Sequence, residues 1–379
     1  MAVRILHAHS TFSLGGKEAR AVRLMNAFGE AAEHTILSGM PGQLSAREAI
    51  AKDISADFPA DAPALTGRPS LRRLFRLSRF MKRFDLVLTY NWGAFDAVMA
   101  HHLFGGPALI HHEDGFNEDE ADQLKTRRNL YRRLGLSGAH RLVVPSERLE
   151  AIARKAWGQP RFRIVRIPNG IPVGRYAAKP AEGAIPGFER REGEIVVGTV
   201  AGLRAVKNLP RLVRAVSAMK ARNVRLVIVG EGPESDRIAA EARAHNIADR
   251  VILPGFLADP ARYIGGFDIF ALSSDSEQFP ISLVEAMAAG LPVAATAVGD
   301  IPSMVSPDNR PLIVGRGDEA ALAAALDTLA ERRDLRRSIG RANREKATAD
   351  FDEARMIGAY SRLYGEAIGA PRAFMGPAA

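Results

Sequence analysis

The chain has 379 residues, more than a single hydrophobic core usually holds, and this length predicts two domains of ordinary size. Its 47% hydrophobic and 25% charged residues are typical of a globular protein, and the absence of cysteine excludes disulfides and thiolate metal sites. Residues 1–19 resemble neither a signal peptide nor a membrane helix, and no run of 18 apolar residues occurs. We therefore expect a cytoplasmic protein.

The net charge of +9 is concentrated in the first half of the chain. Residues 1–180 contain 27 Lys and Arg against 17 Asp and Glu, a net +10. Residues 181–379 contain 25 against 26, a net −1. A basic half attracts anionic partners, namely nucleic acid, a membrane surface or an acidic substrate.

Short runs rich in Val, Ile and Leu alternate with helical patterns along the whole chain. These runs show little polar–apolar alternation, as in strands that are buried on both faces of a parallel sheet. They occupy residues 3–9, 34–39, 85–90, 107–112, 140–146, 194–202, 224–230, 250–255, 268–274, 292–298 and 310–315. Helical patterns occupy, among others, residues 17–30, 209–222, 319–340 and 351–369. The alternation predicts an α/β fold of two Rossmann-like, doubly wound parallel-sheet domains.

The alternation breaks at residues 168–193, where four Pro and five Gly predict a linker without helix or strand. We expect an N-terminal domain at residues 1–172, the linker at 173–193 and a C-terminal domain at 194–348. A last helix and a tail are expected at residues 349–379. Two such domains would face each other across a cleft, with ligand at the carboxyl ends of their sheets.

Two glutamates lie eight positions apart, Glu277 in a loop and Glu285 in the first turn of a predicted helix. Carboxylates so placed could hold the hydroxyl groups of one polar ligand, such as a ribose and a sugar, by charge-assisted hydrogen bonds. The helix N-terminus would add N–H groups for an anion. Taken alone, two such carboxylates are more often solvated charges near a helix start.

Arg204 and Lys207 lie three positions apart in a loop between a predicted strand and a predicted helix. Two cations beside a helix N-terminus suit a diphosphate, although a loop Arg or Lys on its own is more often solvated. After the next strand, Gly230 and Gly232 could allow a ligand to approach closely or could serve a strand-to-helix turn.

His111 and His112 end a predicted strand within the segment 107–122, and Glu113 and Asp114 follow them directly. This string first suggests a metal site. Consecutive strand residues point to opposite faces, however, so the two histidines are poorly placed to share one ion. We therefore expect no metal.

The order of these motifs resembles the retaining glycosyltransferases of family 4, which have the GT-B fold. Glu277 and Glu285 with the string EAMAAGLPV and the following VGDIP carry most of the resemblance. It extends over nearly the whole chain through the glycine loop at 13–24, the strand ending in His112, Pro145-Ser146-Glu147, Pro168-Asn169-Gly170, the loop with Arg204 and Lys207, and residues 229–233. The residues themselves predict that Ser146 is a helix N-cap. The resemblance further implies that the last helix crosses back to pack on the N-terminal domain.

The resemblance implies how a nucleotide-sugar donor would be held. Arg204 and Lys207 would neutralise the leaving diphosphate, and the backbone of Gly15 and Gly16 would lie close to it. Glu277 would hold the sugar and Glu285 the ribose. The rest of the nucleoside and sugar would contact Phe256, Leu257, Phe279, Pro280, Ile281, Ser282 and Leu283.

The resemblance also implies a His facing the donor sugar and the acceptor at the end of the strand 107–112. His112 is the first choice and His111 the second, with Asp114 orienting the acceptor or the imidazole. One departure stands at Gln278-Phe279, where the family often has Gly or Glu, and it leaves the identity of the sugar open.

The implied reaction moves a sugar from a UDP-, GDP- or ADP-linked donor to a glycan or lipid-linked acceptor in polysaccharide or lipopolysaccharide synthesis. No cofactor and no metal are expected, because cationic side chains and a helix N-terminus would take the charge role of Mg²⁺. Two rivals remain: a sugar-nucleotide epimerase of the same fold, and a non-catalytic nucleotide-sugar or membrane-binding protein. A dehydrogenase is disfavoured, since no strand ends in G-x-G-x-x-G with a following acidic residue.

Residues 70–84 and 125–133 carry most of the basic side chains of the first half. In the first of these segments we expect one apolar helix face of Leu71, Leu74, Phe75 and Met81. Such a basic amphipathic helix suits either solvent or an anionic membrane surface, the latter giving a peripheral contact with the inner face of the membrane. Nucleic acid is not expected as a partner, because interleaved stacking aromatics are absent.

Overall fold

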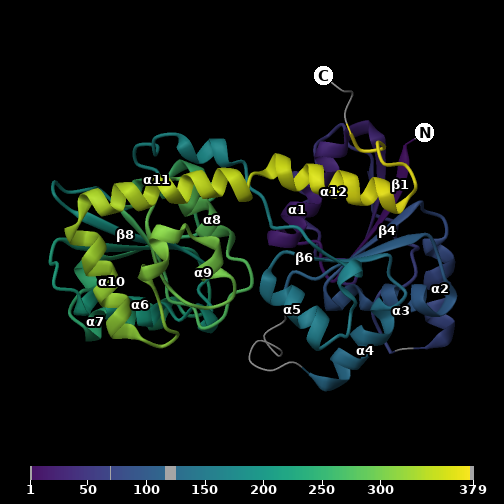
Figure 1. Cartoon of the computed structure of the whole chain (residues 1–379), viewed down its shortest axis with the longest axis horizontal. Helices are drawn as coiled ribbons and strands as arrows, with labels where there is room; N and C mark the ends of the chain where they lie inside the picture. Colours follow the sequence, from purple (N-terminus) through teal and green to yellow (C-terminus); the bar gives the residue numbers. More distant parts are fainter. Residues whose placement is uncertain (1, 69, 116–124, 376–379) are drawn as a thin grey trace. The chain divides into compact units, whose positions relative to one another are not determined.

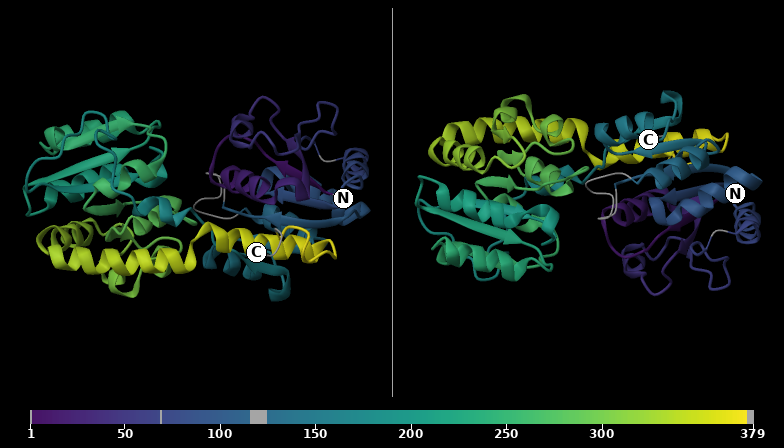
Figure 2. Two further views of the ribbon diagram at one scale, coloured as in Figure 1. Left: turned by 90° about the horizontal axis from the view of Figure 1, so that it is seen from above. Right: turned by 90° about the horizontal axis from the view of Figure 1, so that it is seen from below.

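The computed structural model describes residues 2–68, 70–115 and 125–375 of the chain. It divides into two compact units: unit 1 comprises Met1–Asn169 and Ala354–Ala379, and unit 2 comprises Gly170–Glu353. In each unit a parallel sheet lies between layers of helices (Figures 1 and 2). The chain therefore leaves unit 1, builds unit 2 and returns to unit 1 for its last helix.

The sheet of unit 1 has seven parallel strands in the order β3-β2-β1-β4-β5-β6-β7. Its strands are β1 (Val3–His9), β2 (Ala32–Ser38), β3 (Ala56–Asp57), β4 (Leu86–Tyr90), β5 (Ala108–His112), β6 (Arg141–Val144) and β7 (Ile164–Arg166). Every residue of β4 is buried, as expected for a central strand that is covered on both faces.

Two hydrophobic clusters hold the helices of unit 1 on opposite faces of this sheet. Helices α1 and α12 share one cluster, and α2, α3, α4 and α5 share the other. Their bounds are α1 (Gly16–Phe28), α2 (Leu71–Met81), α3 (Phe95–Phe104), α4 (Thr126–Leu136), α5 (Glu147–Lys155) and α12 (Glu353–Ala367). The hydroxyl of Ser146 accepts a hydrogen bond from the backbone N–H of Leu149, so the predicted N-cap of α5 is confirmed.

The sheet of unit 2 has six parallel strands in the order β10-β9-β8-β11-β12-β13. Its strands are β8 (Ile195–Val200), β9 (Val224–Val229), β10 (Val251–Gly255), β11 (Ile269–Leu272), β12 (Val293–Thr296) and β13 (Ile313–Val314). One face is covered by α6 (Leu209–Ala218), α7 (Ser235–Ala244) and α10 (Glu319–Glu331). The other face is covered by α8 (Ile281–Ala288) and α9 (Ile301–Met304), and α11 (Arg333–Asp350) packs beside α8.

The strand order reverses direction once in each sheet, between β1 and β4 and between β8 and β11. In doubly wound sheets ligands bind beside the carboxyl ends of the strands at this point. In unit 2 the residues that follow β8 and β11 include the short 3-10 helix η7 (Ala205–Lys207) and the segment 273–278. These are the segments in which the sequence placed the donor site.

Each of the eleven predicted strand ranges overlaps a strand, and the predicted doubly wound α/β fold is confirmed. The sequence missed β3 and β7, which have two and three residues and lack a recognisable apolar run. The expectation of a linker without helix at 173–193 is wrong. This segment contains the 3-10 helix η6 (Val173–Ala177), and Val173, Tyr176 and Ile185 are buried in the core of unit 2.

The apolar face predicted for α2 is only partly correct. Leu74 and Met81 are buried, together with Leu77 and Ser78. Leu71 and Phe75, however, are 70% and 47% exposed. Positions 74, 77, 78 and 81 form one stripe at helical spacing, whereas position 75 lies beside that stripe and position 71 lies in the first turn.

Within the three described ranges, no helix combines the length and the apolar character needed to cross a membrane.

Candidate active site

Lys207 and Glu277 meet at the carboxyl ends of β8 and β11 in unit 2. Nζ of Lys207 donates to Oε1 of Glu277 at 2.6 Å, and the hydroxyl of Ser274 donates to the same oxygen at 2.7 Å. The two charged side chains are only 15% and 7% exposed. An ammonium group so placed can exchange its carboxylate partner for a phosphate, which frees the carboxylate to accept hydrogen bonds from sugar hydroxyls.

Arg204 is exposed and lies directly before η7. Two glycines determine the path of the loop that carries it, since a Cβ at Gly230 would lie 1.9 Å from the carbonyl oxygen of Ala201. A Cβ at Gly232 would lie 2.5 Å from that of Leu203, and both glycines have positive φ. These glycines therefore allow two backbone segments of the protein to pack together.

Glu285 lies in the second turn of α8 rather than in the first. Its Oε1 accepts a hydrogen bond from the hydroxyl of Tyr176 at 2.9 Å. Burial raises the pKa of the nearby Tyr263 well above its usual value, and the negative charge of Glu285 adds to this effect. Tyr176 is a contact that the sequence missed, because it lies in the segment expected to be a linker.

The predicted nucleoside contacts differ in how accessible they are. The ring of Phe256 is 67% exposed and its backbone N–H donates to Glu231 at 3.3 Å, whereas Leu257 packs partly against the core. An exposed aromatic ring at the edge of the sheet is free to stack on a base, because stacking requires only an open face.

The predicted contacts at the start of α8 are partly structural. Phe279 packs edge-on against Phe351, with ring centroids 5.6 Å apart, and Pro280 is the N-cap of the helix without a capping side chain. Ile281 and Ser282 are half-buried. The side chain of Leu283 is completely buried, so Leu283 is a core residue and its side chain is not available to a donor.

In unit 1 the side chain of Asp114 is held by Arg20 of α1. The two form a bidentate ion pair, with Nη2 of Arg20 2.8 Å from Oδ2, and Nη1 of Arg20 also donates to Asn169 at 2.8 Å. Burial raises the pKa of Asp114, but the charge and the hydrogen bonds of Arg20, together with the nearby His112 and Lys17, outweigh burial and hold this pKa below its usual value. Arg20 and Asn169 were not predicted as site residues, because nothing in their local sequence points to Asp114.

His112 is buried, and both of its ring nitrogens have partners. Nδ1 lies 3.2 Å from the carbonyl oxygen of Thr89, and Nε2 lies 2.8 Å from the hydroxyl of Tyr364 in α12. Burial and the charge of Arg20 lower the pKa of His112 to about 3, so the ring is neutral at pH 7. A neutral ring with the proton on Nδ1 fits both contacts, since Nε2 then accepts from Tyr364.

His111 lies on the opposite face of β5, as the sequence predicted. Its Nδ1 lies 2.8 Å from the hydroxyl of Thr89, and its Nε2 lies 3.7 Å from Glu113. Glu113 lies 3.4 Å from Nε of the buried Arg132. The acidic residues at 116–122 lie outside the described residues.

Four buried histidines lie on the strands β1, β2 and β5, and we call them the histidine cluster: His7, His9, His34 and His112. Nε2 of His7 lies 3.0 Å from Nδ1 of His34, and the ring of His9 stacks on Tyr90 at 4.0 Å. Burial lowers the pKa of His34 to about 4 and the pKa values of His7 and His9 well below their usual range.

The predicted glycine loop lies at the start of α1. Gly15 is the N-cap with extended backbone, Gly16 begins the helix, and Lys17 forms an ion pair with Glu18 in the first turn. Among the described residues, no group of three His, Asp or Glu side chains is arranged to hold a metal ion.

Comparison with known proteins matches both halves of the chain. Residues 14–175 match the profile of Glycosyltransferase Family 4, and residues 184–346 match that of Glycosyl transferases group 1. The chain is 28% identical over 174 residues to N-acetyl-alpha-D-glucosaminyl L-malate synthase of Bacillus anthracis, covering 46% of each protein. It is 29% identical over 224 residues to the putative colanic acid biosynthesis glycosyltransferase WcaL of Escherichia coli, covering 56% of this chain and 53% of WcaL.

The chain thus spans about half the length of the curated relatives it matches. Among solved structures, HepE of Anabaena in complex with UDP superposes with a TM-score of 0.78 at 19% identity, covering 96% of this chain and 100% of HepE. This likeness shows a shared fold. With its two parallel-sheet units and the two matching profiles, the chain belongs to the family 4 glycosyltransferases of GT-B fold.

Proposed function

We propose that the chain is a retaining glycosyltransferase that moves a sugar from a nucleotide-sugar donor to a glycan or lipid-linked acceptor. The observation that carries this proposal is the contact of Lys207 with Glu277, with Arg204 exposed three residues away. It places two cations and a carboxylate at the carboxyl ends of the strands where the strand order reverses. That combination suits one ligand with a diphosphate and several hydroxyl groups.

In the proposed reaction an acceptor hydroxyl oxygen forms a bond to the anomeric carbon of the sugar. The bond between that carbon and the diphosphate oxygen breaks, and the departing diphosphate takes the proton of the acceptor. Arg204 and Lys207 stabilise the charge that develops on the diphosphate, which lowers the barrier most when the cations are in place beforehand. Attack from the same face as the leaving group retains the anomeric configuration.

The second carboxylate of the site, that of Glu285, would hold the nucleoside. Glu285 is proposed to bind the ribose hydroxyls, with the hydroxyl of Tyr176 fixing one of its oxygens at 2.9 Å. The exposed ring of Phe256 is proposed to stack on the base. HepE is described in complex with UDP, which makes a UDP-sugar the first donor to test.

His112 and Asp114 are proposed to act on the acceptor side by orientation rather than by proton transfer. Both ring nitrogens of His112 are occupied by Thr89 and Tyr364, and its pKa of about 3 makes it a poor base at pH 7. Asp114 keeps a charged carboxylate beside Arg20, which could accept one hydrogen bond from an acceptor hydroxyl.

The acceptor is proposed to be a growing cell-surface polysaccharide or lipopolysaccharide at the inner face of the membrane. WcaL is described as a putative colanic acid biosynthesis glycosyltransferase, which supports this class. In unit 1, α3 packs against both α2 and α4, and these three helices expose apolar side chains among basic ones: Leu71, Phe75, Leu103, Leu130 and Leu134. Such a face is suited to an anionic lipid surface.

A donor screen tests the proposal. Purified protein is incubated with each of the common UDP-, GDP- and ADP-sugars and a membrane lipid extract, and nucleoside diphosphate release and the anomeric configuration of the product are followed. We expect release from one donor with retention of configuration, and a loss of at least about a hundredfold in Lys207→Ala. Lys220→Ala is the matched control, because Lys220 is an exposed lysine after the same helix α6.

Three outcomes would contradict the proposal in different ways. An epimerised donor would indicate an epimerase, and tight donor binding without release would indicate a binding protein. Equal loss of activity in the variants at positions 207 and 220 would show that the charge of Lys207 has no particular role.

A further inference from the structure

Two segments of unit 2 interlock around Lys207. The first is the turn formed by η7 and the start of α6, and the second is the segment 273–277, which follows β11. The hydroxyl of Ser273 lies 3.1 Å from the carbonyl oxygen of Lys207 and 2.9 Å from that of Asn208. The backbone of Lys207 is therefore held by the segment that follows β11, independently of the contact that its ammonium group makes with Glu277.

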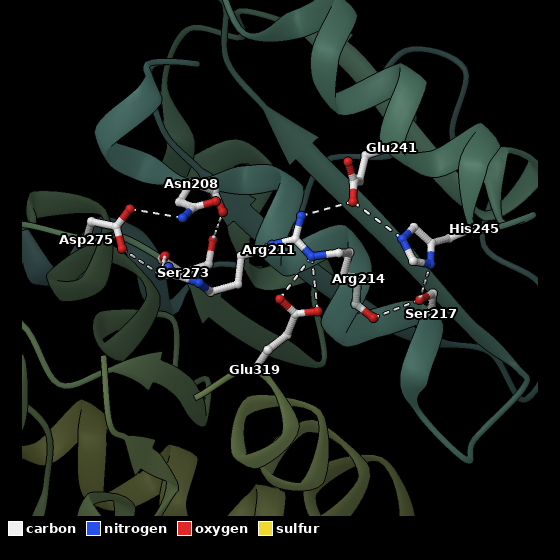
Figure 3. Close-up of polar contacts among 9 residues, drawn as sticks. All are labelled: Asn208, Arg211, Arg214, Ser217, Glu241, His245, Ser273, Asp275 and Glu319. Carbon is white, nitrogen blue, oxygen red and sulfur yellow. Dashed lines mark hydrogen bonds and ion pairs between the residues drawn. The ribbon is translucent and has the colours of Figure 1, made fainter. Parts of the chain in front are cut away.

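Asp275 holds the residues on both sides of Lys207. Its backbone N–H donates to the carbonyl oxygen of Val206 at 2.8 Å, and its Oδ2 accepts from the side-chain amide of Asn208 at 2.9 Å. Asn208 has φ of 43°, in the left-handed region that residues other than glycine seldom adopt. The amide contact with Asp275 thus secures a turn that the backbone alone would not favour (Figure 3).

The charge of Asp275 is balanced by Arg211 of α6. Oδ1 of Asp275 lies 2.8 Å from Nη1 of Arg211, and Nη1 also donates to the carbonyl oxygen of Ser273 at 2.9 Å. Nε of Arg316 lies 3.7 Å from the same carboxylate oxygen. A carboxylate that is paired in this way can fix the turn without strong repulsion of an anionic ligand beside it.

We propose that Asp275, acting through Asn208, is a positioning residue that places the ammonium group of Lys207 for the diphosphate of the donor. The proposal rests on the proposed function, because it deepens the role given there to Lys207. A lysine side chain is a flexible point charge, so its attraction for a phosphate depends on how well its backbone is fixed beforehand. Asp275 supplies that fixation and does not itself touch the donor.

The same helix provides a matched control. Arg214 of α6 also forms ion pairs, but its partners are Glu241 of α7, at 2.9 Å, and Glu319, the first residue of α10, at 3.1 and 2.9 Å. Figure 3 shows the two networks side by side along α6. Loss of Glu319 therefore removes an ion pair of similar kind from the same helix without touching the turn at Lys207.

Binding of UDP, GDP and ADP, and of the three corresponding monophosphates, by calorimetry tests the proposal. We expect the wild-type protein to prefer one diphosphate over its monophosphate. Asp275→Ala and Asn208→Gly should each reduce this preference about tenfold, because each removes a hydrogen bond to a charged group. Asn208→Gly adds no strain at positive φ, so it isolates the loss of the amide.

Two further variants separate positioning from general stability. Asp275→Asn keeps an acceptor for the amide of Asn208 and should restore part of the preference. Glu319→Ala should leave the preference unchanged to within about twofold, since it is not coupled to the turn. Monophosphate affinity should stay unchanged in all four variants. The preference for the diphosphate should be larger in Asp275→Asn than in Asp275→Ala.

The proposal is overturned if Asp275→Ala and Asn208→Gly keep the wild-type preference for the diphosphate. It is equally overturned if they weaken monophosphate and diphosphate binding by the same factor with a drop in Tm, because that indicates a general structural effect. A wild-type protein that binds none of the three diphosphates would refute the proposed function itself, and with it this inference.

Discussion

Acidification should destabilise unit 1 through its buried histidines. The usual pKa of histidine is 6.5, whereas the pKa of His34 is about 4 and that of His112 about 3 in the folded protein. Between pH 6.5 and pH 4 the unfolded chain therefore binds protons that the folded chain does not bind. The stability of unit 1 is therefore at its full value above pH 6.5 and decreases as the pH falls below 6.5.

The size of the effect follows from this linkage. From pH 7 to pH 5 each of the two histidines favours the unfolded chain by about 2 kcal/mol, so together they cost about 4 kcal/mol. His7 and His9 shift in the same direction and add to the loss. Domains are typically stable by roughly 5–15 kcal/mol, so unit 1 should approach unfolding near pH 5.

Tryptophan fluorescence measures this unit selectively. The chain has two tryptophans, Trp92 and Trp157, and both lie in unit 1. Urea titrations followed by fluorescence at pH 5, 6 and 7 give the free energy of unfolding of unit 1. His34→Gln should remove about 2 kcal/mol of the loss on acidification, whereas replacement of the exposed His102 by Gln should leave the loss unchanged. A change below about 1 kcal/mol between pH 7 and pH 5 would refute the reasoning.

Three further predictions concern other features. Gly230→Ala should destabilise unit 2 by at least about 2 kcal/mol in calorimetry, because its Cβ would meet the Ala201 oxygen at 1.9 Å. The control Gly183→Ala, which has open space around it, should lower the free energy of unfolding by only about 1 kcal/mol. Phe75→Ser should weaken sedimentation with phosphatidylglycerol vesicles several-fold, whereas Phe256→Ser in unit 2 should not, and equal binding by all three proteins would contradict a lipid face on α2. Sugar transfer should survive EDTA, since Arg204 and Lys207 supply the positive charge; loss of activity that Mg²⁺ restores would show that a metal takes part.

The parts of the fold that could be predicted are those set by local pattern. Unbroken apolar runs such as Ile269–Leu272 mark strands that are buried on both faces, and alternation with helices then implies parallel sheets. Lys207 and Glu277 could be placed near one another because each follows a strand. The carboxyl ends of parallel strands lie at one edge of a sheet, so residues that follow them converge.

The parts that could not be predicted depend on contacts between distant residues. Tyr176 lies 109 positions from Glu285, and Tyr364 lies 252 positions from His112. No local pattern connects such pairs, and Tyr176 stands in a segment whose Pro and Gly content is typical of a linker. The exposure of Leu71 and Phe75 has a similar cause, since helical spacing gives a stripe but not where the underlying core ends.

The division of unit 1 between two separate parts of the chain has a consequence for biosynthesis. A growing chain leaves the ribosome with its N-terminus first, and continuous domains generally fold as they emerge. Unit 2 is continuous and can fold as soon as it leaves the ribosome, whereas unit 1 must wait for α12, which brings Tyr364 to His112. Until then the sheet face that α12 covers stays open to chaperones and to proteases. The unit that is translated first is therefore completed last, and nascent chains arrested before residue 354 should be selectively sensitive to proteolysis in unit 1.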